Sequence, residues 1–243
     1  MAVNEGEHDV FGMIGEHTVV WRGQTAFFDV CIVESPSLGR ALFLDEVLQS
    51  TTLDEAEYHE ALVGPAMRRF GAELPRDVLI LGAGEGATTR DVLRRESVER
   101  VVAVDLDGEL MDVVREHLFE LHEGALDDPR VELRIEDARD TLRRAGEGSF
   151  DLIIVDLTDP PDASLGPTPE VAPVLDLEFI RGLRAVLREG GIVSVQAGES
   201  NPPSAASVYS PLPALREVFG QVEVEHRWIE AFNMDWTFAL AMG

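Results

Sequence analysis

The pattern of apolar and polar positions changes near residue 54 of the 243-residue chain. Before this point, short apolar-rich segments are bounded by turn residues, which is typical of β-strands. The strands predicted there are His17–Arg22, Phe27–Glu34 and Arg40–Leu44. From Asp54 to Phe70 the apolar positions recur at helical spacing, and Asp54 stands where an N-cap would stand. We therefore expect a small β-appendage over residues 1–53, followed by a linking helix.

After Leu74-Pro75, apolar strands alternate with amphipathic helices, as expected for a parallel sheet that is covered on both faces. The strands predicted in this part are Val78–Leu81, Arg100–Leu106, Val131–Ile135, Phe150–Val155, Ile192–Gln196, Val222–Trp228 and Trp236–Ala241. Seven strands with the last two closely spaced are similar to the sheet of S-adenosylmethionine-dependent transferases. We therefore expect residues 54–243 to form a doubly wound, Rossmann-type α/β domain with a methyltransferase-like sheet.

The formal net charge of −26 at pH 7 argues against nucleic acid as a partner, because phosphate binding needs an excess of basic residues. The same charge attracts cations and suits a polycationic substrate, although an acidic surface also serves solubility. All 20 basic residues are arginine. The absence of lysine excludes a Schiff-base lysine and a Walker phosphate loop.

A single cysteine, Cys31, excludes an internal disulfide and a zinc site built on cysteine pairs. No metal is expected from the histidines either, since His117 and His122 are five residues apart and do not share a helical face. The chain has no apolar run long enough to span a bilayer and no signal-peptide pattern at Met1. We expect it in the cytoplasm, without a membrane partner.

The strand Val78–Leu81 leads into Gly82-Ala83-Gly84-Glu85-Gly86-Ala87, a glycine-rich turn that can open a helix over a nucleotide-like ligand. Asp105 ends the next predicted strand, where a carboxylate can accept both ribose hydroxyls. This spacing also satisfies the dinucleotide fingerprint of NAD proteins. Glu85 would repel a pyrophosphate but can pair with a sulfonium or an ammonium, so we prefer an adenosyl sulfonium. The alternative is a turn kept only for packing.

Two further strand ends carry acidic residues. Asp137, followed by Ala138, can accept the adenine amino group, or it can act as a helix N-cap. Asp156 and Asp159 follow the fourth of these strands, and two carboxylates three residues apart can bind an amine. An alkyl amine is protonated at neutral pH, so attack on carbon needs a base, and Asp156 is our candidate. A turn before Pro160 is the alternative reading of Asp159.

Several motifs stand together in the order found in the polyamine aminopropyltransferases, the spermidine, spermine and thermospermine synthase family, which the chain resembles from about Phe27 to Met242. These motifs are Leu44–Ser50, Asp54-Glu55, Tyr58-His59-Glu60, Gly82–Gly86, Val104–Asp107, Glu136–Ala138, Asp156–Pro160 and Gln196. The resemblance implies transfer of an aminopropyl group from decarboxylated S-adenosylmethionine to a polyamine, with release of methylthioadenosine. It also implies a homodimer or homotetramer.

The resemblance further assigns roles to individual residues. Those assigned to the cosubstrate are Gln49, His59, Gly82, Gly84, Glu85, Asp105, Asp137 and Ala138. Those assigned to the amine are Tyr58, Asp156, Asp159, Gln196 and Trp236, with Asp156 as the catalytic residue. Physical reasoning agrees at Glu85, which can pair with the ammonium tail that remains after decarboxylation and repel the carboxylate of S-adenosylmethionine itself.

Two segments depart from the family pattern. Phe28 stands where the family usually has glutamine, which removes a polar contact near the cosubstrate. The segment Glu230–Trp236 resembles thermospermine synthases and bacterial triamine enzymes more than enzymes that use putrescine, so we expect a longer acceptor. Two alternatives stay open at this point: an S-adenosylmethionine-dependent N-methyltransferase, and a non-catalytic homologue that binds a polyamine or nucleoside.

Overall fold

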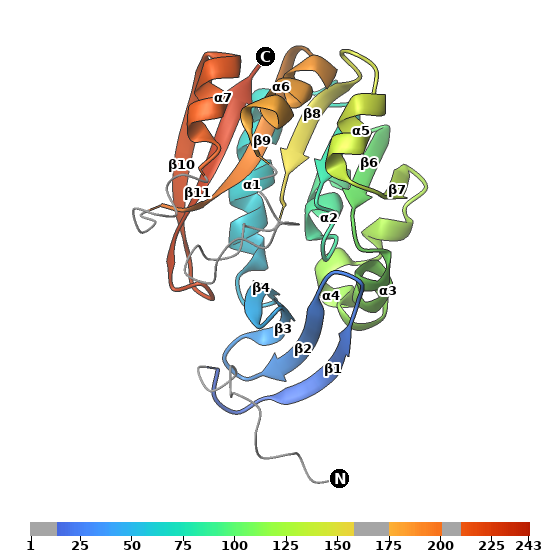
Figure 1. Ribbon diagram of the computed structural model, residues 1–243, viewed down its shortest axis with the longest axis vertical. Helices are drawn as coiled ribbons and strands as arrows, with labels where there is room; N and C mark the ends of the chain where they lie inside the picture. Colours follow the sequence, from blue (N-terminus) through green and yellow to red (C-terminus); the bar gives the residue numbers. More distant parts are fainter. Residues whose placement is uncertain (1–13, 158–174, 201–209) are drawn as a thin grey trace.

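The computed structural model describes residues 14–157, 175–200 and 210–243, which form two β-sheets and the helices that cover them (Figure 1). A four-stranded sheet lies at the N-terminal end of the chain, and a seven-stranded sheet contains the remaining strands. The small sheet lies beyond the ends toward which the parallel strands of the large sheet point. It therefore faces the sheet edge where α/β proteins bind their ligands.

The N-terminal sheet is an antiparallel meander in the order β1-β2-β3-β4. Its strands are β1 (Thr18–Gln24), β2 (Asp29–Ser35), β3 (Gly39–Leu44) and β4 (Val47–Thr51). β4 was not predicted from the sequence. Asp45 and Glu46 form the β3–β4 turn with φ of 48° and 68°, a left-handed conformation that Asn-Gly or Asp-Gly normally signals. Two acidic residues in this turn do not carry that signal.

The two faces of the small sheet differ in what they cover. Val30, Ile32 and Leu42 belong to the same hydrophobic cluster as Leu62 of α1 (Glu55–Arg69). Cys31, on the opposite face of β2, belongs to a separate small cluster with its neighbours in the sheet. The first face therefore joins the N-terminal sheet to the core of the main domain.

The large sheet has the order β10-β11-β9-β8-β5-β6-β7, with β11 antiparallel to both of its neighbours. Its strands are β5 (Asp77–Leu81), β6 (Arg100–Asp105), β7 (Val131–Ile135), β8 (Phe150–Val155), β9 (Leu187–Glu199), β10 (Gln221–Ile229) and β11 (Met234–Met242). The seven predicted strands are all present, and β9 is longer than predicted at both ends. The chain order reverses between β5 and β8, as in a doubly wound sheet. The α/β fold class is therefore confirmed.

Alternate residues of each central strand enter two different cores. Val78 and Ile80 face a cluster that includes α1, α2 and α3, whereas Leu79 and Leu81 face a cluster that includes α5, α6 and α7. The helices after α1 are α2 (Ala87–Leu93), α3 (Gly108–His117), α4 (Phe119–His122), α5 (Ala138–Arg144), α6 (Leu177–Val186) and α7 (Leu212–Phe219), with a 3-10 turn at Ala125–Asp127. A strand buried on both faces needs the continuous apolar run seen in β5.

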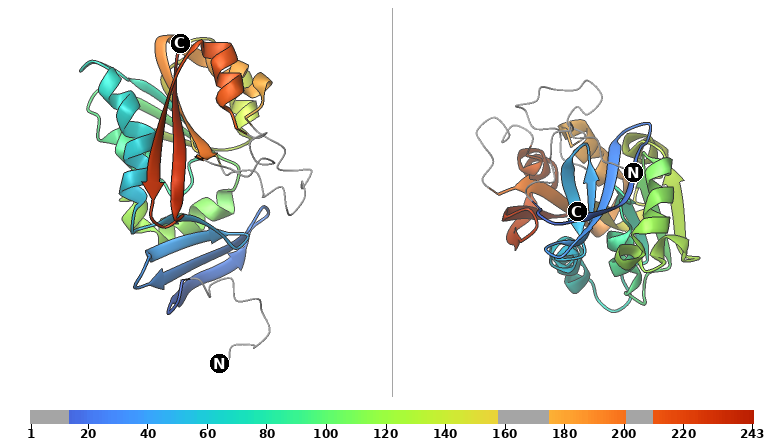
Figure 2. Two further views of the ribbon diagram at one scale, coloured as in Figure 1. Left: turned by 90° about the vertical axis from the view of Figure 1, so that its left-hand side faces the viewer. Right: turned by 90° about the horizontal axis from the view of Figure 1, so that it is seen from below.

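The tip of the β10–β11 hairpin reaches down to the N-terminal sheet (Figure 2). Asp54 makes the connection: its Oδ2 accepts a hydrogen bond from the Ala231 backbone N–H at 2.7 Å, and its Oδ1 accepts one from the Thr51 hydroxyl at 2.8 Å. Asp54 stands at the N-cap position of α1, but its side chain makes no capping bond. Asp54 is therefore the predicted N-cap residue, but its two side-chain oxygens accept from Thr51 and Ala231 and not from the first turn of α1.

Among the described residues, no helix has both the length and the apolar character needed to cross a membrane.

Candidate active site

The glycine loop after β5 lies against the end of β8. Gly82 has φ of 88°, and a Cβ at this position would lie 2.1 Å from the backbone oxygen of Asp156. Only glycine fits there, because both the backbone conformation and the space exclude a side chain. Gly84 has φ of 46°, but a Cβ there would meet no atom within 4 Å. The loop is thus tightly packed at Gly82 and open at Gly84, where a ligand can approach the backbone.

Asp105, at the end of β6, faces this loop. Its Oδ2 accepts a hydrogen bond from the Gly84 backbone N–H at 2.9 Å, and its Oδ1 accepts one from the Asp107 N–H at 3.0 Å. Burial raises the pKa of Asp105, and these backbone hydrogen bonds oppose the increase. Asp105, the residue predicted to accept the ribose hydroxyls, therefore lies beside the glycine loop.

Asp156, the predicted base, lies directly after β8 and is held by two hydroxyl groups. Tyr58 of α1 donates to its Oδ1 at 2.8 Å, and Thr88 of α2 donates to its Oδ2 at 2.9 Å. The carboxylate is therefore oriented from two helices at the switch point of the sheet. Thr88 was not predicted, because its contact with β8 depends on how α2 packs and has no local sequence pattern.

His59 and Glu85 lie beside this carboxylate. His59 is 2% exposed, its Nδ1 donates to the Glu55 backbone oxygen at 2.7 Å, and its Nε2 lies 3.6 Å from Glu85 Oε1. Burial alone would lower the pKa of His59, but the hydrogen bond to Glu55 and the charges of Glu85 and Asp156 raise it to about 9. His59 is therefore positively charged at neutral pH.

Glu55 and Arg90 support His59 and were not assigned from the sequence. The two terminal nitrogens of the Arg90 guanidinium, Nη1 and Nη2, donate to the Glu55 carboxylate at 3.1 and 2.7 Å. Burial would raise the pKa of Glu55, but its hydrogen bonds with His59 and Arg90 lower it to about 2. The spacing of Glu55 four residues before His59 on a helix was an available signal. The contact with Arg90 was not readable, because that residue comes from another helix.

Aromatic side chains form the other wall of the site. The Tyr58 ring meets Phe238 edge-on with centroids 5.1 Å apart, and it meets Phe232 at 6.3 Å. Phe232 in turn packs on Trp236 at 5.0 Å. The Trp236 indole donates to Gln196 Oε1 at 3.1 Å, so Tyr58, Gln196 and Trp236 line one continuous region. Phe232 adds an aromatic contact that was predicted only as part of the Glu230–Trp236 segment.

Two predicted site residues, Gln49 and Asp137, form hydrogen bonds within their own segments. Asp137 is exposed and accepts a hydrogen bond from the Arg139 N–H at 2.7 Å, so it caps α5, which begins at the buried Ala138. The Gln49 amide donates to the Val47 carbonyl at 3.2 Å. Asp159 lies outside the described residues. The capping alternative for Asp137 is therefore realised.

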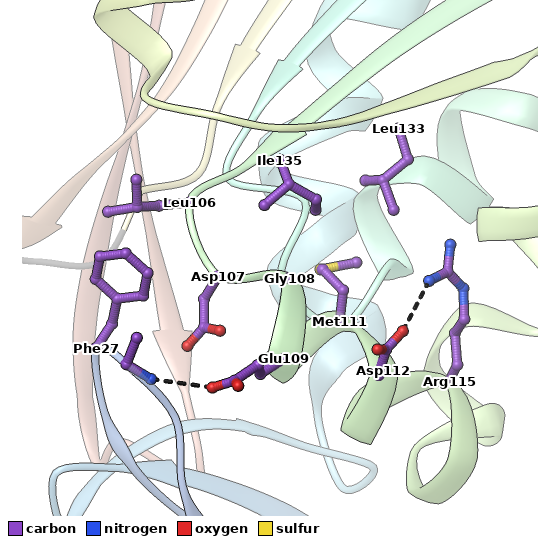
Figure 3. Close-up of a pocket in the computed structure, with 11 residues that line it drawn as sticks. Phe27, Leu106, Asp107, Gly108, Glu109, Met111, Asp112, Arg115, Leu133 and Ile135 are labelled. Atoms are coloured by element: carbon purple, nitrogen blue, oxygen red, sulfur yellow. Dashed lines mark hydrogen bonds and ion pairs between the residues drawn. The ribbon is translucent and has the colours of Figure 1, made fainter.

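A cavity of about 460 Å³ lies next to Leu106, on the side of the loop after β6 (Figure 3). Its three carboxyl groups all have partners. Asp107 accepts from the Thr25 hydroxyl at 2.5 Å, Glu109 accepts from the Ala26 N–H at 3.1 Å, and Asp112 pairs with Arg115 at 3.5 Å. Two of these contacts tie the β1–β2 turn to the start of α3. These two hydrogen bonds hold the N-terminal sheet against the loop that follows Asp105.

In the part of the chain that the structure describes, no group of three or more His, Cys, Asp or Glu side chains is arranged to hold a metal ion.

Comparison with known proteins identifies the family. The model of the Spermine/spermidine synthase domain matches residues 55–241. Polyamine aminopropyltransferase 2 of Pseudomonas aeruginosa is 42% identical over 223 residues, covering 92% of this chain and 62% of that protein. Polyamine aminopropyltransferase of a Synechococcus strain is 41% identical over 220 residues, covering 90% of this chain and 69% of that protein. The chain therefore spans about two thirds of the length of these relatives.

A solved structure agrees with this result. Spermidine synthase in complex with the transition state analogue AdoDATO superposes with a TM-score of 0.83 at 28% identity, covering 92% of this chain and 73% of that chain. The resemblance predicted from the ordered motifs is thus confirmed by sequence and by fold. The chain belongs to the spermine/spermidine synthase family.

Proposed function

We propose that the chain is a polyamine aminopropyltransferase that moves an aminopropyl group from decarboxylated S-adenosylmethionine to an amine longer than putrescine. The observation that carries this proposal is the Asp156 carboxylate, held by Tyr58 and Thr88 at the switch point of the sheet and adjacent to His59 and Glu85. A fixed carboxylate beside an aromatic wall suits a protonated amine that must lose a proton before it reacts.

The reaction follows from this geometry. Asp156 takes a proton from the acceptor ammonium, and the freed lone pair on nitrogen attacks the aminopropyl carbon attached to the sulfonium. The carbon–sulfur bond breaks, its electron pair stays on sulfur, and neutral methylthioadenosine leaves. Tyr58 and Thr88 already hold the carboxylate in one orientation, so no conformational entropy of this side chain is lost when the amine reacts.

The proposed cosubstrate positions surround the glycine loop. Gly84 allows the ligand to approach the backbone, Gly82 lets the loop pack on the end of β8 beside the ligand, and Asp105 accepts the ribose hydroxyls. Gln49, His59 and Ala138 complete this group in the proposal, and Asp137 binds adenine with an oxygen that is not used for the helix cap. Glu85 receives the ammonium that decarboxylation leaves on the tail, and it repels the carboxylate of S-adenosylmethionine.

The proposed amine positions lie on the other side of Asp156. Tyr58, Gln196 and Trp236 surround the alkyl chain, and Asp159 holds a second ammonium. The acidic composition supports a polycationic acceptor, since a net charge of −26 attracts cations toward the protein. We expect an acceptor longer than putrescine because of the resemblance of Glu230–Trp236 to triamine enzymes.

We further propose that residues 1–53 and 54–243 form two domains, that the protein is a homodimer or homotetramer, and that it acts in the cytoplasm. Size-exclusion chromatography with light scattering measures the oligomeric state directly. The single cysteine is compatible with a reducing compartment.

The proposal is tested by incubating the purified protein with either cosubstrate and with putrescine, agmatine, spermidine or spermine. We expect methylthioadenosine only with the decarboxylated cosubstrate, and the highest rate with spermidine or spermine. Release of S-adenosylhomocysteine would identify an N-methyltransferase instead. Binding without any product would identify a non-catalytic homologue.

The role of Asp156 is tested by Asp156→Asn, which keeps the shape of the side chain but removes the base. We expect kcat to fall by about 10²–10⁴-fold, the usual contribution of a positioned base, while cosubstrate binding measured by calorimetry persists. Turnover at the unmodified rate would show that Asp156 is not the base.

A further inference from the structure

Charged side chains from α1, α2 and the glycine loop form one chain of alternating sign. Arg90 pairs with Glu55, Glu55 Oε2 lies 3.2 Å from His59 Nδ1, and His59 Nε2 lies 3.6 Å from Glu85 Oε1. Glu85 is 16% exposed in its side chain, Glu55 is 14% exposed and Arg90 is 6% exposed. The inner members are therefore shielded from solvent, where charges interact strongly.

The partners of His59 define its protonation state. The atoms facing Nδ1 are the backbone oxygen and the carboxylate of Glu55, and the atom facing Nε2 is a carboxylate oxygen of Glu85. All of these accept hydrogen bonds or carry negative charge, so both ring nitrogens are best satisfied as donors. The geometry therefore favours the imidazolium, in agreement with the raised pKa of His59.

Glu85 needs a positive neighbour to remain ionised. Burial raises the pKa of Glu85, the charge of His59 lowers it, and the charge of Asp156 raises it again. Among the described residues no arginine forms an ion pair with Glu85, and its cationic partner is His59. If His59 lost its charge, Glu85 would take up a proton more readily and would lose its attraction for a cation.

We propose that Glu55 and Arg90 are positioning residues that hold His59 as an imidazolium, and that this charge keeps Glu85 ionised to receive the ammonium of the cosubstrate. The identity of that cosubstrate rests on the proposed function. Glu55 and Arg90 act through His59 and do not touch the substrate themselves.

Other charged groups around this chain do not replace Glu55. Asp156 faces His59 but accepts hydrogen bonds from Tyr58 and Thr88. Asp91 is occupied by Arg90 Nε at 2.9 Å and by Arg94 at 2.8 Å. Arg90 is further fixed by donating to the Leu121 carbonyl at 2.7 Å. Glu55 is thus the carboxylate that faces the Nδ1 side of His59.

The first test needs no substrate. Glu55→Gln keeps the size of the side chain and removes its charge, and Glu57→Gln is the matched control on the exposed side of the same helix. Histidine labelled for NMR, with the His59 signal assigned by a His59→Gln variant, gives the titration midpoint directly. We expect a midpoint near 9 in the unmodified protein and in Glu57→Gln, and a midpoint lower by about one pH unit or more in Glu55→Gln.

A conservative variant guards against a merely structural effect. Glu55→Asp keeps the charge, so its His59 midpoint should lie closer to that of the unmodified protein than the midpoint of Glu55→Gln does. An unchanged midpoint in Glu55→Gln, with the fold intact by circular dichroism, would overturn the role of Glu55. In Arg90→Gln the loss of a nearby positive charge by itself favours the imidazolium, so a midpoint below that of the unmodified protein would show that Arg90 acts by orienting the Glu55 carboxylate, and a higher midpoint would overturn this role.

The second test connects His59 to Glu85. Calorimetric binding of decarboxylated S-adenosylmethionine should begin to weaken at a lower pH in Glu55→Gln than in the unmodified protein, because His59 loses its charge at a lower pH and Glu85 then takes up a proton more readily. A parallel pH dependence in Glu55→Gln and the unmodified protein would overturn the link to Glu85. Failure of aminopropyl transfer in the unmodified protein would refute only the proposed function, because the His59 titration is measured without substrate.

Discussion

The two sides of the Asp156 site are built in different ways. The proposed cosubstrate side consists of loops that directly follow parallel strands, and Gly82 packs against the backbone of Asp156 without room for a side chain. The proposed amine side is formed by an antiparallel hairpin whose tip is joined to α1 through Asp54. The first side is defined by backbone geometry, and the second by contacts between side chains.

This difference has a consequence for how each side tolerates change. A backbone that passes within contact distance of another backbone cannot absorb an added methyl group, because neither chain can move without disturbing its sheet. Side chains at the tip of a hairpin can be substituted while the two strands keep their register. We therefore expect substitutions on the cosubstrate side to destabilise the whole fold, and substitutions on the amine side to change amine binding alone.

The largest effect is expected for Gly82→Ala. The new Cβ would meet the Asp156 oxygen at 2.1 Å and would impose a φ of 88° on alanine. We expect a loss of about 3 kcal/mol or more in the free energy of unfolding, from strain and overpacking together. Urea unfolding followed by circular dichroism measures this loss.

Gly84→Ala is the matched control in the same loop. A Cβ at Gly84 meets nothing within 4 Å, so only the cost of the left-handed conformation remains, about 1–2 kcal/mol. Equal destabilisation by the two variants would show that backbone contact with β8 does not distinguish them. Weaker cosubstrate binding in Gly84→Ala, with the fold retained, would agree with an open ligand position.

An intermediate effect, confined to the amine side, is expected for Asp54→Ala. This change leaves the Ala231 N–H and the Thr51 hydroxyl without their acceptor, at a cost of about 1–3 kcal/mol. The hairpin tip that carries Phe232 should then lose its fixed position against Tyr58. Steady-state kinetics should show an increase of about tenfold in the KM for the amine, equivalent to about 1.4 kcal/mol.

Asp54→Asn keeps one acceptor oxygen and should have a smaller effect than Asp54→Ala. Calorimetry with the cosubstrate gives the decisive control, because its affinity should be unchanged in both variants. A weaker affinity for the cosubstrate with an unchanged KM for the amine would contradict the separation of the two sides.

The same difference explains what the sequence could predict. The positions of Asp105 and Asp156 at strand ends could be predicted, because apolar strands and a glycine turn are local patterns. Their location at one edge could also be predicted, since parallel strands bring their carboxyl ends to the same edge of a sheet. Thr88, Arg90 and the bond from Asp54 to Ala231 were not readable. Each depends on how one element packs on another that is distant in the sequence, and such contacts have no local signature.

Residues with two possible roles were a separate difficulty. Asp137 was consistent with adenine binding and with helix capping, and the structure shows the cap. Asp54 was consistent with capping, and the structure shows a link between segments instead. In both cases the backbone position was predicted correctly, and the partner of the side chain was decided by neighbours that the local sequence does not specify.

The smallest effect is expected for Trp236→Phe, which keeps an aromatic ring beside Phe232 and removes the indole donor to Gln196. One hydrogen bond contributes about 0.5–1.5 kcal/mol, so the KM for the amine should rise roughly two- to tenfold. Trp228→Phe is the matched control on the same hairpin, because Trp228 is 49% exposed and its indole donates to Glu230 instead. Kinetics with spermidine should separate the two variants, whereas cosubstrate affinity should not. An equal rise in KM for both would mean that the aromatic wall acts through the stability of the hairpin as a whole and not through the contact with Gln196.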